Sequence, residues 1–143
     1  MFIATSSSAR VSRPDGTPPG LIRAYRLTSY AVDGVVVRPG RRSAGFDRLL
    51  RRSRCRTATF IAADNPFSRR MPPGWNRRMQ HRLRCAARRH AVLAATGSWR
   101  GWREAHLLLF GDPRPVLRLA RIFRQRAVVV VRLNQPAAVV LIV

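Results

Sequence analysis

Glu104 and His106 are the two residues of this sequence whose types and spacing most resemble a general acid–base pair. They lie two positions apart where an apolar segment with strand composition, 105–110, begins. Because alternate side chains of a strand share a face, both should point the same way, as groups acting on one substrate must. In the alternative that we favour, the two residues only flank an apolar strand, and Glu104 pairs with one of many arginines.

A second group of polar residues follows the apolar candidate strand 57–63. Polar side chains at the carboxyl end of a central strand line the usual ligand crevice of α/β sheets. The Asn-Pro-Phe-Ser turn after this strand could therefore bind a ligand, although its polar side chains could instead satisfy backbone groups of their own loop. A glutamine at a later helix end could complete the pocket or cap its helix. The candidate pocket residues are Asn65, Ser68, Asn76, Glu104 and Gln125.

The sequence lacks the motifs that are typical of zinc-dependent proteases, of phosphate-binding glycine loops and of enzymes with a serine nucleophile. There is no H-E-x-x-H, no glycine-rich phosphate loop and no G-x-S-x-G segment. His81 and His90 are not assigned to a metal, and Cys55 and Cys85 are expected to be buried structural residues. We therefore assign no metal and no cofactor, and whether the chain is an enzyme stays open, with the balance toward a non-catalytic protein.

Binding of a polyanion is the chemistry that the composition favours. All 28 basic residues are arginine, against 6 acidic ones, so 143 residues carry a formal net charge of +22 at pH 7. Guanidinium groups make bidentate contacts with phosphate, and the deficit of acids leaves most of them without a carboxylate partner. A GC-rich genome would explain the absence of lysine, but it does not explain the deficit of acids. RNA or another polyanion is the expected partner.

Arginines recur along two predicted helices, and they alternate with tryptophans in a predicted loop, 97–103. That composition suits stacking on unpaired bases together with phosphate contacts, although the tryptophans could instead pack into the core. No helix-turn-helix or RNP signature is present, so we expect no reading of base sequence. The candidates for nucleic-acid contact are Arg77, Arg78, Arg82, Arg89, Trp99, Arg100, Trp102, Arg103, Arg114, Arg118 and Arg121.

The elements that must position these residues are expected to form one α/β domain over 21–143, after a disordered lead at 1–20. Helices are predicted after a Ser43 cap, over 74–90, and after an Asp112 cap. The expected fold is an α/β sandwich with a mixed sheet of about six strands and three helices. Segments with strand character lie at 24–32, 35–37, 57–63, 92–96, 105–110, 127–131 and 138–143.

Two further local features bear on this fold. Asp33-Gly34 is typical of a tight hairpin turn, because both residues tolerate a positive φ. The apolar segment 138–143 would be an aggregation-prone edge strand if it were exposed. We therefore expect it either to be central in the sheet or to pair with a second copy in a homodimer.

The segments 57–63 and 65–70, followed by Asn-Arg-Arg at 76–78, resemble a known family. They are similar to the T-A-F-I-T-A-x-N-P-x-S and N-R-R segments of small bacterial proteins classed as a domain of unknown function, the DUF3293-like family. The resemblance implies a compact α/β domain. It assigns no catalytic residue, because the family has no established activity. Members usually carry serine where this chain has His106.

No apolar run approaches the ~20 residues of a membrane span, and the first residues lack the apolar stretch of a secretory signal, so we expect a cytoplasmic bacterial protein. We expect it to bind RNA or nucleoprotein without catalysis, through its arginine surface and aromatic stacking. The alternative is a small enzyme or ligand-binding domain with a polar pocket near the Asn-Pro-Phe-Ser loop. A third hypothesis is a homodimeric interaction protein that is basic only through genomic drift.

Overall fold

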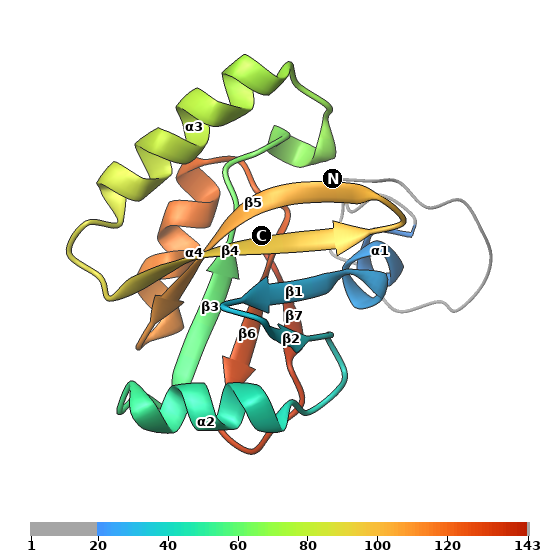
Figure 1. Cartoon of the computed structure of the whole chain (residues 1–143). Coiled ribbons are helices and arrows are strands. Elements are labelled where there is room, and N and C mark those ends of the chain that lie inside the picture. The colour runs from blue at the N-terminus through green and yellow to red at the C-terminus, as the bar shows by residue number, and fades with distance from the viewer. Residues whose placement is uncertain (1–19, 143) are drawn as a thin grey trace.

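The computed structural model describes residues 20–142, so the expected lead at 1–20 lies outside the described residues except for Gly20. One seven-stranded sheet runs through this part in the order β2-β1-β4-β5-β3-β6-β7 (Figure 1). Its strands are β1 Ser29–Val32, β2 Val35–Val37, β3 Thr57–Ile61, β4 Val92–Trp99, β5 Trp102–Phe110, β6 Ala127–Arg132 and β7 Ala138–Leu141. The helices are α1 Leu21–Leu27, α2 Ala44–Arg52, the 3₁₀ helix η1 Pro66–Ser68, α3 Pro73–Ala86 and α4 Pro113–Ile122.

Helices cover both faces of the sheet, and each face has its own core. On one face α1 and α2 pack against the sheet, with Phe46 of α2 in edge contact with Phe60 of β3. On the other face α3 and α4 pack through Leu83 and Val116 against apolar side chains of the same strands. The described part of the chain is therefore an α/β domain, as expected from its alternating elements, and the two covered faces of the sheet give it three layers.

The sheet is antiparallel in every ladder, whereas a mixed sheet was predicted. The helical crossovers do join parallel strands, because α3 links β3 to β4 and α4 links β5 to β6. However, β5 lies between β3 and β4, and β3 lies between β5 and β6. The parallel pairs are thus never hydrogen-bonded neighbours. The prediction of about six strands and three helices was short by one strand and by α1.

The helix α1 replaces the first part of a predicted strand, 24–32. Leu21, Ala24 and Tyr25 form its buried face at helical spacing. The Tyr25 hydroxyl donates a hydrogen bond of 3.3 Å to the carbonyl of Ala127, and the Thr28 hydroxyl closes the helix by donating to the carbonyl of Ala24 at 2.7 Å. Contacts with a distant strand outweigh the local β-propensity of these residues.

Local signals in the sequence were confirmed at two caps and one turn. Ser43 accepts a hydrogen bond from the Phe46 N–H at the start of α2, and Asp112 accepts one from the Arg114 N–H at the start of α4. The β1–β2 hairpin turns through Asp33 and Gly34 with φ of 48° and 77°. These features depend on neighbouring residues only, which is why a short segment of sequence predicts them.

The predicted loop at 97–103 is instead a tight hairpin between two long strands. Trp99 of β4 pairs directly with Trp102 of β5, and only Arg100 and Gly101, with φ of 48° and 75°, make the turn. Arginine is uncommon in the left-handed conformation, so the sequence lacked the usual turn signal at this position. The two tryptophans consequently lie side by side at the tip of a hairpin.

The C-terminal strand β7 lies at an edge of the sheet and pairs with β6. Its position excludes the central placement that was one of two expectations, and pairing of this edge with a second copy stays a prediction. Within the described part of the chain, no helix is both long and apolar enough to cross a bilayer.

Candidate functional site

Asn65 is the centre of a buried hydrogen-bond network behind the end of β3. Its side-chain Oδ1 accepts hydrogen bonds from the Met71 N–H at 2.9 Å and from Asn76 Nδ2 at 3.0 Å. Its backbone N–H donates to Asn76 Oδ1 at 3.0 Å. The side-chain Nδ2 donates to Glu104 Oε1 of β5 at 3.0 Å. One amide therefore joins the segment after β3, the first turns of α3 and the start of β5.

The loop that Asn65 begins is held in a strained conformation. Asn65, Phe67 and Ser68 have φ of 48°, 51° and 62°, in the left-handed region that costs a non-glycine residue roughly 1–2 kcal/mol. Contacts from the chain after α4 hold it: the Phe67 N–H donates to the carbonyl of Arg124 at 2.6 Å, and Arg126 Nε donates to the carbonyl of Phe67 at 3.0 Å. Strain of this kind is retained where surrounding contacts fix the backbone.

Glu104 and His106 share a face of β5, as predicted, but they do not form an acid–base pair. The His106 ring lies 5.4 Å from the ring of Tyr30 in edge contact within the core, and its burial lowers the pKa of the imidazole. A Cβ atom at Gly97 would lie 2.9 Å from His106 Cε1, so only glycine fits opposite the ring. His106 is thus a packed core residue.

A pocket of about 450 Å³ opens between the loop after Asn65, the N-terminal half of α3 and the start of β5. Three of the five predicted pocket residues, Asn65, Asn76 and Glu104, line it. Ser68 and Gln125 do not: Gln125 Nε2 instead donates to the carbonyl of Asp64 at 3.0 Å from behind. The other lining residues are Asp64, Arg70, Met71, Pro73, Arg77, Gln80, Gly101, Trp102, Arg103 and Ala105.

The inner wall of this pocket is acidic and its lining is otherwise rich in arginine. Burial, and after it the negative charge of Glu104, raises the pKa of the Asp64 carboxyl from 3.8 to about 6. Asp64 Oδ1 and Gln80 Oε1 are both buried atoms that accept no hydrogen bond from the described residues. The pocket therefore combines guanidinium groups with carbonyl-type oxygens that still need a donor.

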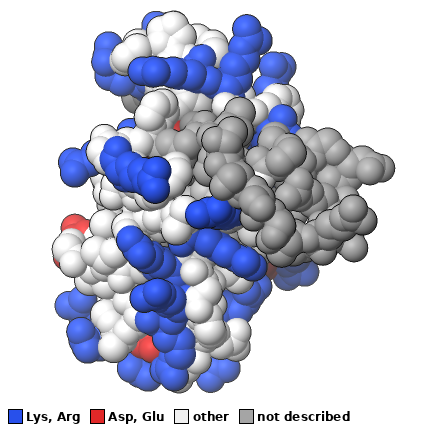
Figure 2. Space-filling model, turned by 90° about the vertical axis from the view of Figure 1, so that its right-hand side faces the viewer, with Lys and Arg blue, Asp and Glu red and all other residues white. Residues whose placement is uncertain are grey.

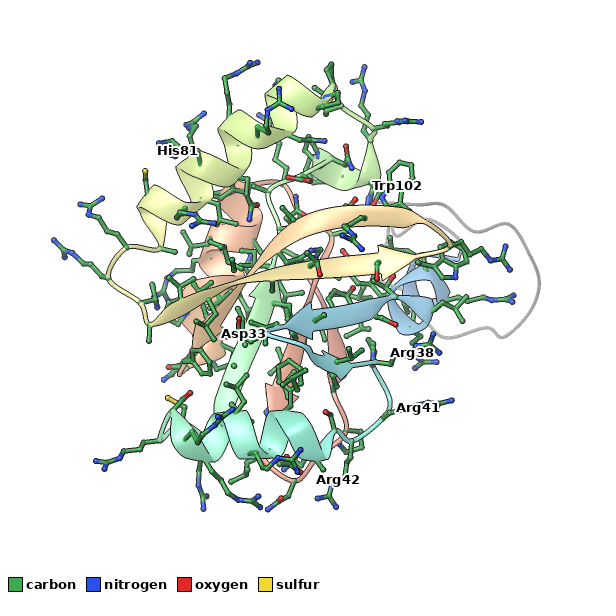
Figure 3. The ribbon with its side chains drawn as sticks, in the orientation of Figure 1. Asp33, Arg38, Arg41, Arg42, His81 and Trp102 are labelled. Carbon is green, nitrogen blue, oxygen red and sulfur yellow. The ribbon has the colours of Figure 1, made fainter. Side chains whose placement is uncertain are left out.

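A second pocket, of about 330 Å³, adjoins the first one. Arg38, Trp99 and Arg100 line it, and the residues Gly101–Arg103 line both pockets. Figure 3 shows Arg38 and Trp102 at the same end of the sheet. We call the two pockets together the basic groove, and its arginines and tryptophans are Arg38, Arg70, Arg77, Trp99, Arg100, Trp102 and Arg103.

Each tryptophan of the basic groove has a guanidinium group over its ring. Arg70 lies 5.2 Å from the ring centre of Trp102, and Arg100 lies 5.0 Å from that of Trp99. Nearby, Arg126 lies 5.5 Å from the ring centre of Phe67, whose side chain is 53% exposed. Aromatic faces that already accept a planar cation also suit a nucleobase.

Of the eleven residues predicted to contact nucleic acid, five meet in the basic groove: Arg77, Trp99, Arg100, Trp102 and Arg103. The others lie elsewhere. Figure 2 shows arginine side chains over the whole height of the face that carries α1 and the β4–β5 turn, with few acidic ones among them. The predicted residues outside the groove are Arg78 and Arg82 on α3, Arg89 after it, and Arg114, Arg118 and Arg121 on α4.

Asp64, Gln80, Arg38 and Arg70 line the groove but were not among the predicted site residues. Asp64 directly precedes Asn65, so the rule that placed polar residues at the end of the central strand could have included it. Arg70 and Gln80 fall in the predicted loop and on the predicted helix beside Asn76. Arg38 had no such signal, because only the pairing of β1 with both β2 and β4 brings it to the hairpin tip.

No three His, Cys, Asp or Glu side chains within 20–142 come together as metal ligands would. The expectation of two buried cysteines was wrong, since Cys55 is half-buried and Cys85 is exposed. Cys85 Sγ lies 3.6 Å from His81 Nε2 of the preceding helical turn, a contact that the spacing of four residues allows.

One comparison with known proteins gave a match. Residues 61–128, from the last residue of β3 into β6, match a family model described as a protein of unknown function, DUF3293. This confirms the resemblance suggested by the sequence. The curated proteins and the solved structures gave no match.

Replacing Asn65 with alanine should lower the free energy of unfolding by more than about 2 kcal/mol, because several buried hydrogen bonds are lost together. Ser68→Ala is the matched control, since this residue has the same left-handed backbone and its side chain makes no hydrogen bond with the described residues. We expect the control to stay within about 0.5 kcal/mol of the native chain in urea denaturation. Equal effects of the two changes would contradict a central role of the Asn65 amide.

Asp64 should make stability depend on pH. Its pKa is about 6 in the folded chain against 3.8 ordinarily, so the folded state holds the proton more tightly. The resulting stabilisation is complete below pH ~4 and is lost as the pH rises through ~6. Because the side chain is partly exposed, we expect about 1 kcal/mol. The unfolding free energy of the native chain minus that of Asp64→Asn should fall by this amount between pH 4 and pH 7. A difference that does not change with pH would contradict the raised pKa of Asp64.

Proposed function

We propose a function from the site itself, because the family model that residues 61–128 match is described only as a protein of unknown function. The chain binds single-stranded nucleic acid, RNA above all, in the basic groove. The proposed role is binding without catalysis. The observation that carries this proposal is the meeting of five arginines and two tryptophans in two adjoining pockets.

Stacking is the first part of the proposed interaction. Trp99 and Trp102 are neighbours across the β4–β5 hairpin, and each presents a ring face on which a guanidinium group now lies. An unpaired base can stack on such a face or between the ring and the guanidinium group, and each stacked base contributes about 1–3 kcal/mol. This favours a strand with unpaired bases over a duplex, whose bases are hidden in their own stack.

Phosphate contacts are the second part. The groove arginines come from four separate places: the residue after β2, the loop before α3, α3 itself and the β4–β5 hairpin. Arginines on different elements can contact successive phosphates of a nucleic-acid strand that lies along the groove, whereas a single arginine-rich helix would offer only one row of phosphate contacts. The backbone positions the strand without reading its sequence, which agrees with the lack of a base-reading motif.

The remaining arginines have a different part in this proposal. In the described part of the chain they include arginines of α1, α2, α4 and α3, and further ones lie in the connecting segments. With a formal net charge of +22, the molecule has a strong positive field. Such a field speeds the encounter with any polyanion but does not select a binding position. A test of the proposal must therefore separate the groove from the general charge.

The affinity for a single-stranded 12-nucleotide RNA should fall linearly with salt on logarithmic axes, with a slope near −3.5 for about five phosphate contacts. The double variant Arg100→Gln, Arg103→Gln should bind about tenfold more weakly or worse, and its slope should be shallower by about 1.4. Fluorescence anisotropy across a salt series measures both quantities.

The matched control is Arg48→Gln, Arg52→Gln, which removes the same charge from exposed positions of α2. This control should keep the affinity within about threefold of the native chain, because it changes only the general field. Equal losses in the two double variants would show that RNA binds to charge alone and would overturn the assignment to the groove.

A further inference from the structure

The larger pocket of the groove contains groups that a phosphate backbone does not need. Asp64 Oδ1 and Gln80 Oε1 are buried acceptors without a hydrogen bond from the described residues. Both residues line the pocket, Asp64 from the segment after β3 and Gln80 from α3. A phosphodiester group of a nucleic-acid backbone carries only acceptors and cannot satisfy them, so a ligand that does must offer N–H or O–H donors.

The same pocket holds the complementary groups for an anion and for a planar ring. Arg70, Arg77 and Arg103 supply positive charge, and Trp102 supplies an aromatic face. The volume of about 450 Å³ falls within the range of about 300–1,000 Å³ that is usual for small-molecule sites. A partner that fits all three features has a ring with donor groups and a negatively charged group attached to it.

We propose that this pocket is a specific site for one nucleotide, whose base stacks on Trp102 and donates hydrogen bonds to Asp64 and Gln80 while its phosphate contacts the arginines. The inference rests on the proposed function in one respect, because the natural occupant is then one nucleotide of the bound strand. Free phosphate, a free nucleoside and a nucleotide share parts of this chemistry, and only the nucleotide offers all of it.

Two acceptors in the pocket also imply a preference among bases. Adenine, cytosine and guanine carry an exocyclic amino group with two donor hydrogens, whereas uracil has a single N–H on its ring edge. Nucleotides with an amino group should therefore bind more tightly than uridine monophosphate. The preference is a property of the pocket, and the phosphate contacts along the rest of the groove do not contribute to it.

The test uses the intact chain and titration calorimetry at fixed salt, with the four 5′-ribonucleoside monophosphates, the matching nucleosides and inorganic phosphate. At least one amino-bearing monophosphate should bind about tenfold more tightly than its nucleoside, phosphate or uridine monophosphate. Asp64→Asn replaces one of the two carboxylate oxygens by an NH2 donor and should weaken that binding about tenfold. Asp33→Asn, the same change in the exposed β1–β2 turn, should leave it within about twofold.

Gln80→Met is a second variant that removes the other acceptor and keeps a similar shape, so the inference stays testable if Asp64→Asn does not fold. It should also weaken the monophosphate. If no monophosphate binds better than phosphate, or if both pocket variants bind as the native chain does, the inference is overturned.

A single-stranded oligonucleotide measured in parallel separates the two proposals. Binding of the oligonucleotide without any preference for monophosphates overturns the nucleotide site and leaves the groove function standing. Specific binding of a monophosphate without binding of the oligonucleotide supports the pocket and overturns the groove function. Failure of both ligands overturns both proposals.

Discussion

The buried side-chain amide of Asn65 is the interaction on which the candidate site depends. It holds the start of α3 through Asn76, the loop before α3 through the N–H of Met71, and β5 through Glu104. The larger pocket of the groove is built from these same segments, because Arg70 lies in that loop, Arg77 on α3 and Trp102 on β5. Asparagine suits this position, since it tolerates the left-handed backbone and its amide both donates and accepts.

Three of the six acidic residues lie where separate segments of the chain meet. Asp47 joins α2 to the β6–β7 turn by accepting from the Asn134 N–H at 2.8 Å, with Arg42 3.3 Å away on the other oxygen. Asp64 and Glu104 lie in the inner wall of the larger pocket of the groove. These carboxylates therefore act where segments meet, so the excess of arginines is left at the surface, where it is available to a polyanion.

What could be predicted from the sequence was local or followed a rule about strand ends. The caps at Ser43 and Asp112 and the Asp33-Gly34 turn need only neighbouring residues. Asn65 was predicted as a pocket residue because it follows the end of a predicted strand, and Glu104 was singled out because it lies two positions from His106 at an apolar predicted strand. Helix α1 was missed because the hydroxyl of Tyr25 forms a hydrogen bond with a residue 102 positions away. The antiparallel sheet was missed because its strand order depends on long-range pairing, which places β5 between β3 and β4 and places β3 between β5 and β6.

The measurement that tests the account most directly is a cross-linking map of the native chain with a single-stranded RNA that carries photoreactive 4-thiouridine, read by mass spectrometry of the peptides. The groove predicts cross-links concentrated in the segments 65–80 and 97–104, with Trp99 and Trp102 among the modified residues. Cross-links spread evenly over α2, α4 and the groove would contradict it, because they would show that the arginine surface binds RNA through charge alone.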